Sequence, residues 1–132
     1  MSTLKADTIV AADGSSPVTL TKQSAAKAFV NFDGSGTASI TKSLNYSSIT
    51  DNATGNYTFA FTSNFDDANY IEVSGGGADD GTANNLILLV GAYRGTSPTT
   101  SQLRIQTSYI SSGAYTDLDG QRPCSTQFGD LA

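Results

Sequence analysis

The sequence SSITDNATGNYTFAFTSNF, which occupies Ser47–Phe65, carries the clearest structural signal in the chain. Ile49 and Thr50 lead into a turn-forming cluster, Asp51–Asn56. Side chains then alternate between an aromatic face and a small or polar face: Tyr57, Phe59 and Phe61 against Thr58, Ala60 and Thr62. Successive side chains of a strand point to opposite faces, so this pattern predicts a half-buried strand leaving a hairpin. The aromatic row should face the core.

Composition narrows the class of protein. The chain has 132 residues, which fits one domain, and only 14% of them are charged. Low charge combined with abundant Ser, Thr and Gly disfavours a solvated helical bundle. The net charge of −5 disfavours nucleic acid and anionic membrane surfaces as partners. There is no histidine, the usual general base near neutral pH.

Further strand signals lie on both sides of the opening stretch. Ala28–Phe32 is followed by Asp33–Gly36, where Gly34 and Gly36 can supply positive φ for a hairpin. The other predicted strands are Thr37–Tyr46 (the return strand), Tyr70–Val73 (closing the sheet of the aromatic hairpin), Gln102–Ile110, Ala114–Leu118, and an edge strand within Arg122–Ala132. About eight to ten short strands separated by turns predict an all-β fold, a compact β-sandwich or jelly-roll-like domain over residues 27–132.

Residues 1–26 are predicted to form an extended N-terminal arm. They carry too few apolar residues for a core of their own, and the candidate docking residues are Leu4, Ile9, Val18 and Leu20. Such an arm either orders by docking on its own domain, on sister subunits or on a neighbouring protein, or remains a flexible tail.

One run is apolar on both faces, which a half-solvated strand does not tolerate. It consists of Leu86, Ile87, Leu88, Leu89 and Val90. Two interpretations follow: a central strand of the sandwich, or a strand covered by a neighbouring subunit, as around a threefold axis. On the second interpretation these residues form an oligomer interface.

Two loops are candidate partner-facing surfaces. Asp79 and Asp80 lie in the Gly-rich segment 75–85; they could bind Ca²⁺, but the EF-hand spacing is absent, which favours solvated acids. Tyr93 and Arg94 form a pair of residue types enriched at binding surfaces, although an ordinary exposed turn explains them too. Cys124 is the single cysteine and is interpreted as a packed or idle thiol. We expect no catalytic, cofactor-binding or metal-binding residues.

Two longer blocks carry a family resemblance. TLTKQSAAKAFVNFDGSGT (Thr19–Thr37) is followed by SLNYSSITDNATGNYTFAFTSNFDDANY (Ser43–Tyr70). Together with the opening MSTLKADTI, they resemble a module of small tail-fibre-like virion proteins of tailed bacteriophages, especially marine ones. The resemblance covers roughly residues 1–73. One departure is Phe29, where a tryptophan is expected, and the resemblance weakens after Val73.

This resemblance implies a non-enzymatic structural protein of the virion with a β-sandwich-like module, often trimeric. The tail-fibre interpretation expects the arm to anchor the protein to other virion proteins and the loops to contact a host receptor or glycan. The alternative is a capsid decoration, cement or head-fibre protein. A polysaccharide depolymerase is a remote third option, because the chain is short and has no tryptophan. The N-terminus shows no signal peptide, and no apolar run is long enough to span a membrane, so the expected location is the virion after synthesis in the host cytoplasm.

Overall fold

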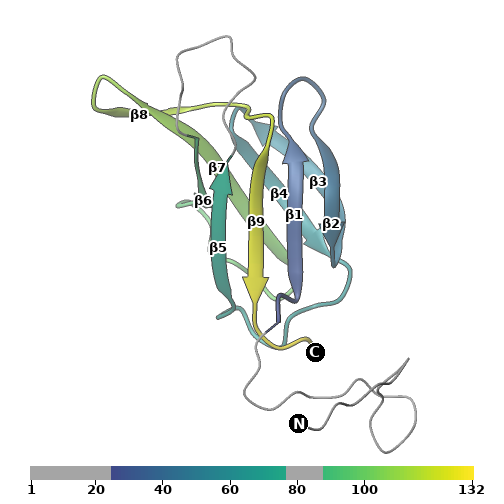
Figure 1. Cartoon of the computed structure of the whole chain (residues 1–132). Coiled ribbons are helices and arrows are strands. Elements are labelled where there is room, and N and C mark those ends of the chain that lie inside the picture. Colours follow the sequence, from purple (N-terminus) through teal and green to yellow (C-terminus); the bar gives the residue numbers. More distant parts are fainter. Residues whose placement is uncertain (1–24, 77–87) are drawn as a thin grey trace, which may run out of the picture.

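The chain folds into two packed antiparallel sheets, as the computed structural model in Figure 1 shows. The structure describes residues 25–76 and 88–132. Within these ranges there are nine strands and no helix. The predicted all-β sandwich is therefore confirmed. The predicted arm boundary at residue 26 remains a prediction, because residues 1–24 lie outside the described part.

Each sheet is assembled from strands distant in sequence. The first sheet has the order β2 (Ser39–Leu44), β1 (Ala28–Asp33), β9 (Pro123–Phe128), β5 (Ile71–Gly76). The second has the order β3 (Tyr46–Ala53), β4 (Asn56–Phe61), β7 (Gln102–Ser111), β6 (Leu89–Ala92). The short strand β8 (Ala114–Asp117) pairs with the distal half of β7.

The aromatic row of β4 lies in the core, as predicted. Tyr57 and Phe59 are fully buried and Phe61 nearly so. Phe32 of the opposite sheet packs edge-on against two of them, with ring centroids 5.0 Å from Tyr57 and 4.8 Å from Phe59. Edge-to-face packing suits the ring quadrupoles and adds to the burial of apolar area. These aromatic rings therefore hold the two sheets together.

The hairpin between β3 and β4 is tighter than the sequence predicts. The predicted turn spanned Asp51–Asn56, but β3 continues to Ala53 and leaves only Thr54 and Gly55 in the turn. Gly55 adopts a φ of 66°, which favours glycine. Its N–H donates to Asp119 Oδ1 at 2.7 Å, and the Tyr57 hydroxyl donates to the same oxygen at 2.5 Å. One carboxylate thus fixes the turn and the first aromatic ring of β4.

The prediction of a single return strand over Thr37–Tyr46 is wrong. The chain leaves the first sheet after Leu44 and enters the second sheet at Tyr46. Asn45 makes this change of sheet with a φ of 60°. Its side-chain Oδ1 accepts the Ser63 N–H at 2.7 Å, which holds the crossing. Asparagine tolerates this left-handed conformation better than most residues, so the crossing has a local cause.

Three further predictions need correction. Residues 70–73 were expected in the sheet of the aromatic hairpin, but β5 pairs with β9 in the other sheet. The C-terminal strand was expected at an edge, but β9 lies between β1 and β5. Gly36 has a positive φ of 64°, whereas Gly34 does not. Gly34 is instead required by space, because a Cβ there would collide with the Tyr57 ring.

A chain of polar side chains crosses the interior. The Tyr46 hydroxyl donates to Gln127 Oε1 at 2.6 Å, and Gln127 Nε2 donates to Ser125 Oγ at 2.6 Å. Ser125 Oγ in turn donates to Glu72 Oε1 at 3.1 Å. Burial raises the pKa of Tyr46 far above its ordinary value, with Tyr70 and Glu72 adding to the shift. Satisfied buried groups of this kind specify one pairing of the sheets.

Candidate functional site

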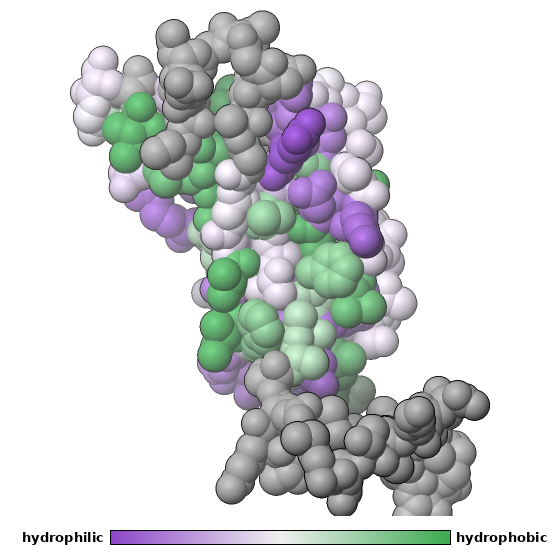
Figure 2. Space-filling view, in the orientation of Figure 1, coloured by the Kyte–Doolittle hydropathy of each residue, from purple (hydrophilic) through white to green (hydrophobic). Residues whose placement is uncertain are grey.

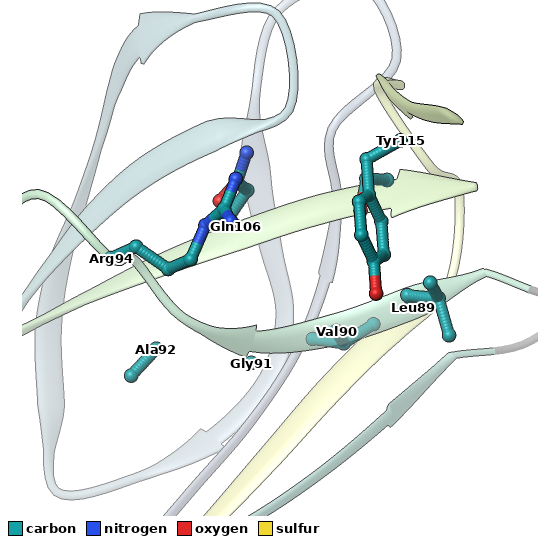
Figure 3. A pocket seen from close by; sticks show the side chains of 8 residues that line it. Leu89, Val90, Gly91, Ala92, Arg94, Gln106 and Tyr115 are labelled. Atoms are coloured by element: carbon teal, nitrogen blue, oxygen red, sulfur yellow. The ribbon is translucent and has the colours of Figure 1, made fainter. Parts of the chain in front are cut away.

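An open pocket lies on the outer face of the second sheet, over β6, β7 and β8. Its volume is about 250 Å³. The residues that line it include Leu89, Val90, Arg94, Gln106, Ser108 and Tyr115. In Figure 3 the Tyr115 ring stands over the pocket with its hydroxyl directed at β6, while Arg94 extends towards Gln106. The Arg94 guanidinium carbon lies 5.9 Å from the Tyr115 ring centroid.

Strand register explains why these residues meet. Leu89 pairs with Ser108, Gly91 with Gln106, and Ile110 with Tyr115. Residues paired across an antiparallel ladder share a face, so all these positions point away from the core. Gly91 leaves space in the pocket because it has no side chain: a Cβ built there would meet nothing within 4 Å. The pocket therefore results from the register of β6, β7 and β8 and from the absence of a side chain at Gly91.

A second arginine, Arg104, lies two positions before Gln106 on β7 and does not itself line the pocket. Arg104 lies with its guanidinium carbon 4.3 Å from the Tyr93 ring centroid, and its Nε donates to Asn56 Oδ1 at 2.7 Å. Gln106 Nε2 donates to Asp117 Oδ1 at 2.6 Å. Arg104 and Gln106 are thereby held in place, while the Tyr115 side chain is 67% exposed. Cation–π contacts to exposed rings are worth about 0.5–1 kcal/mol each.

The chemistry of the pocket suits recognition. An exposed phenol ring, a guanidinium and an amide offer a flat apolar surface with hydrogen-bond donors beside it. Among residues 25–76 and 88–132, no group of three or more His, Cys, Asp or Glu side chains is placed to hold a metal ion. The same part of the chain contains no helix long and apolar enough to cross a membrane.

The structure brings together part of the predicted site residues. Leu89, Val90 and Arg94 line the pocket, whereas Tyr93 does not and instead packs against Arg104. Leu88 is buried and contacts the positions of Gly76 and Gly120. The remaining predicted residues lie outside the described ranges: Leu4, Ile9, Val18, Leu20, Asp79, Asp80, Leu86 and Ile87.

The interpretation of residues 86–90 as a central strand is wrong for the described part of this run. β6 begins at Leu89 and lies at the edge of its sheet. Val90 packs against the core while Leu89 lines the pocket, so both faces are apolar for different reasons. Whether a neighbouring subunit covers this edge remains a prediction.

Sequence reasoning missed Tyr115 and Gln106. The predicted strand Gln102–Ile110 alternates, which puts Gln106 on the face opposite to Leu103 and Ile105. Tyr115 follows the turn at Ser112 and Gly113, where hairpin pairing puts it opposite Ile110. Both positions follow from the predicted hairpin once its register is known.

A second surface, on the outer face of the first sheet, was also missed. We define the apolar face by five side chains: Phe29, Leu44, Ile71, Val73 and Phe128. Ile71 is 66% exposed and Val73 59%, while Phe29 and Phe128 are half-buried. Figure 2 shows hydrophobic side chains gathered over the lower part of this sheet.

Comparison with known proteins gave no relatives: no family model matches the chain, and neither the curated proteins nor the solved structures contain a significant match.

Proposed function

We propose that this protein is a non-enzymatic structural component of a bacteriophage virion, of the tail-fibre-like kind. The observation that carries the proposal is the resemblance of residues 1–73, whose blocks coincide with the structural centre of the fold. Blocks 19–37 and 43–70 contain β1, the hairpin β3–β4 and the crossing at Asn45. The resemblance thus falls on residues that determine the two sheets.

The two ends of the sandwich have different roles in this proposal. The end of the first sheet where β1 begins faces neighbouring virion proteins. The pocket beside Tyr115 and Arg94 faces the host surface, where it contacts a polar receptor such as a glycan. Strands β2, β3, β5 and β6 lie at sheet edges in the described part of the chain, and assembly as a homotrimer would cover some of these edges.

The pocket at Gly91 allows the host contact to be tested without disturbing the core. Gly91→Leu fills open space at a residue without positive φ, so the fold is retained. We expect it to abolish competition by the purified protein against phage adsorption to host cells. Gly75→Ala is the matched control, because its Cβ meets only Cys124 Sγ at 3.9 Å on the other sheet. Equal competition by the two variants would overturn the host-contact role.

A capsid decoration or cement protein is the second candidate. Its support is the size of the chain: 132 residues with one compact sandwich suit many copies on a lattice. Quantitative mass spectrometry of purified particles separates the candidates. A few to tens of copies per particle support the tail component, and hundreds support the decoration protein. Absence from washed particles would refute both.

A further inference from the structure

We propose that residues 1–24 pack onto the apolar face of their own chain, and so cover the outer surface of the first sheet. The inference does not depend on the virion role. It concerns a surface that strand register makes continuous: Val73 pairs with Thr126, Thr126 with Phe29, and Phe29 with Leu44. Ile71 and Phe128 form the adjacent pair. Every strand of the sheet therefore contributes an apolar side chain to this face, with Thr126 interrupting the first row and Phe128 standing in the second.

This face differs from that of a sheet exposed to water. Antiparallel sheets with one solvated face place polar residues outward. Here the inward positions of β5 and β9 carry Glu72, Ser74, Ser125 and Gln127, while the outward positions carry Ile71, Val73 and Phe128. On β5 the polar side chains thus face the core and the apolar ones face outward, the reverse of a solvated edge strand. Contiguous exposed apolar side chains on an edge indicate a contact surface.

The chain's own N-terminal segment is the occupant best placed to cover this face. The described chain starts at the same end of the sheet, where the Lys27 N–H donates to the Gln127 carbonyl at 2.9 Å and Ala28 pairs with Gln127. Phe29 and Phe128 directly follow these two residues. The segment has the required apolar residues: Leu4, Ile9, Val10, Val18 and Leu20.

The length of residues 1–24 and their high effective concentration also favour the same chain as the occupant of the apolar face. Crossing four strands takes about 15 Å at roughly 4.8 Å between strands. An extended chain covers that distance in about five residues, so a 24-residue segment suffices. A tethered segment acts at an effective concentration in the millimolar range, far above that of a second copy in dilute solution.

Cys124 provides a direct test, because it is the only cysteine and lies outward on β9 two positions from Thr126. A nitroxide on Cys124 of the full chain should broaden the amide NMR signals of residues 4–20. The variant Ile71→Ser/Val73→Ser should lose this broadening, since both side chains are exposed and their replacement leaves the core intact. Ile110→Ser, at a 56% exposed position on the other sheet, should leave it unchanged.

A second label position guards against displacement of the segment by the nitroxide itself. Lys42→Cys in a Cys124→Ser background places the label at the opposite margin of the same face, since Lys42, Asn31 and Cys124 form one row. Signals of residues 4–20 that stay sharp with both labels would overturn the proposal. Broadening in a mixture of isotope-labelled chains and separately spin-labelled chains would overturn it too, because the occupant would then be a second copy.

Discussion

Replacing Asp119 should destabilise the sandwich far more than replacing the nearby Asp117. Asp119 Oδ1 accepts hydrogen bonds from the buried Gly55 N–H at 2.7 Å and from the Tyr57 hydroxyl at 2.5 Å. Asp117 Oδ1 accepts one bond from Gln106 on the exposed face. Asp119→Ala leaves the turn between β3 and β4 without its acceptor, whereas Asp117→Ala leaves groups that water can reach.

The size of the effect follows from these contacts. A buried donor left without a partner costs about 1–3 kcal/mol. The Tyr57 hydroxyl keeps the Gly34 carbonyl as a weaker acceptor at 3.3 Å, so the two losses do not add fully. We expect Asp119→Ala to lower the free energy of unfolding by about 2–4 kcal/mol. Asp117→Ala should change it by about 0.5 kcal/mol or less, as surface substitutions do.

Urea denaturation followed by circular dichroism measures this difference. With a slope of about 2 kcal/mol per molar, the midpoint for Asp119→Ala should fall by about 1–2 M. Asp119→Asn keeps an acceptor oxygen and should fall between Asp119→Ala and the wild type. Equal midpoints for Asp119→Ala and Asp117→Ala would show that this carboxylate does not fix the hairpin.

Three further predictions concern the core, the buried tyrosines and assembly. Phe59→Ala should cost about 3–5 kcal/mol in the same denaturation assay, because Phe59 is fully buried against Phe32 and Tyr46, whereas Tyr115→Ala should cost almost nothing. Burial raises the pKa of Tyr46 and of Tyr57 above the ordinary value of 10.0, so the stabilisation due to these two groups should be constant below about pH 10 and fall as pH rises further. Above that pH the unfolded chain loses protons that the folded chain keeps. The loss should approach about 1.4 kcal/mol per pH unit for each tyrosine, Tyr46→Phe should reduce it, and a flat profile would contradict the burial of these hydroxyls. Multi-angle light scattering at micromolar concentration should give a trimer that Ile87→Asp dissociates, and a monomeric wild type would refute the proposed trimer.

The fold class and the inner face of the second sheet could be predicted from the sequence. The alternation in 57–62 and in 102–110 specifies which side chains are buried, because strand geometry alone decides it. Partner strands could not be predicted, since period-two alternation says nothing of which sheet a strand joins. The crossing at Asn45 depends on one positive φ and one side-chain contact, and it moves β2 and β3 into different sheets.

The candidate pocket was predicted in part for a related reason. The sequence indicated Tyr93 and Arg94 as a candidate partner-facing pair, and Leu89 and Val90 as part of an apolar run. Their meeting with Tyr115 depends on the pairing of β7 with both β6 and β8, which is non-local information. The apolar face escaped prediction because β5 directs the half-buried Glu72 inward and exposes Val73, opposite to the usual preference. The polar interior chain to Gln127 accounts for that reversal.

Immunogold electron microscopy of intact, washed phage particles, with antibodies raised against the purified protein, tests the central claim most directly. The proposed function predicts gold particles at the tail of most virions, and none on particles of a deletion mutant lacking the gene. Labelling spread over the head would contradict the tail-component hypothesis and favour the decoration protein. Unlabelled particles, with the antigen found only in lysate soluble fractions, would contradict a structural role in the virion.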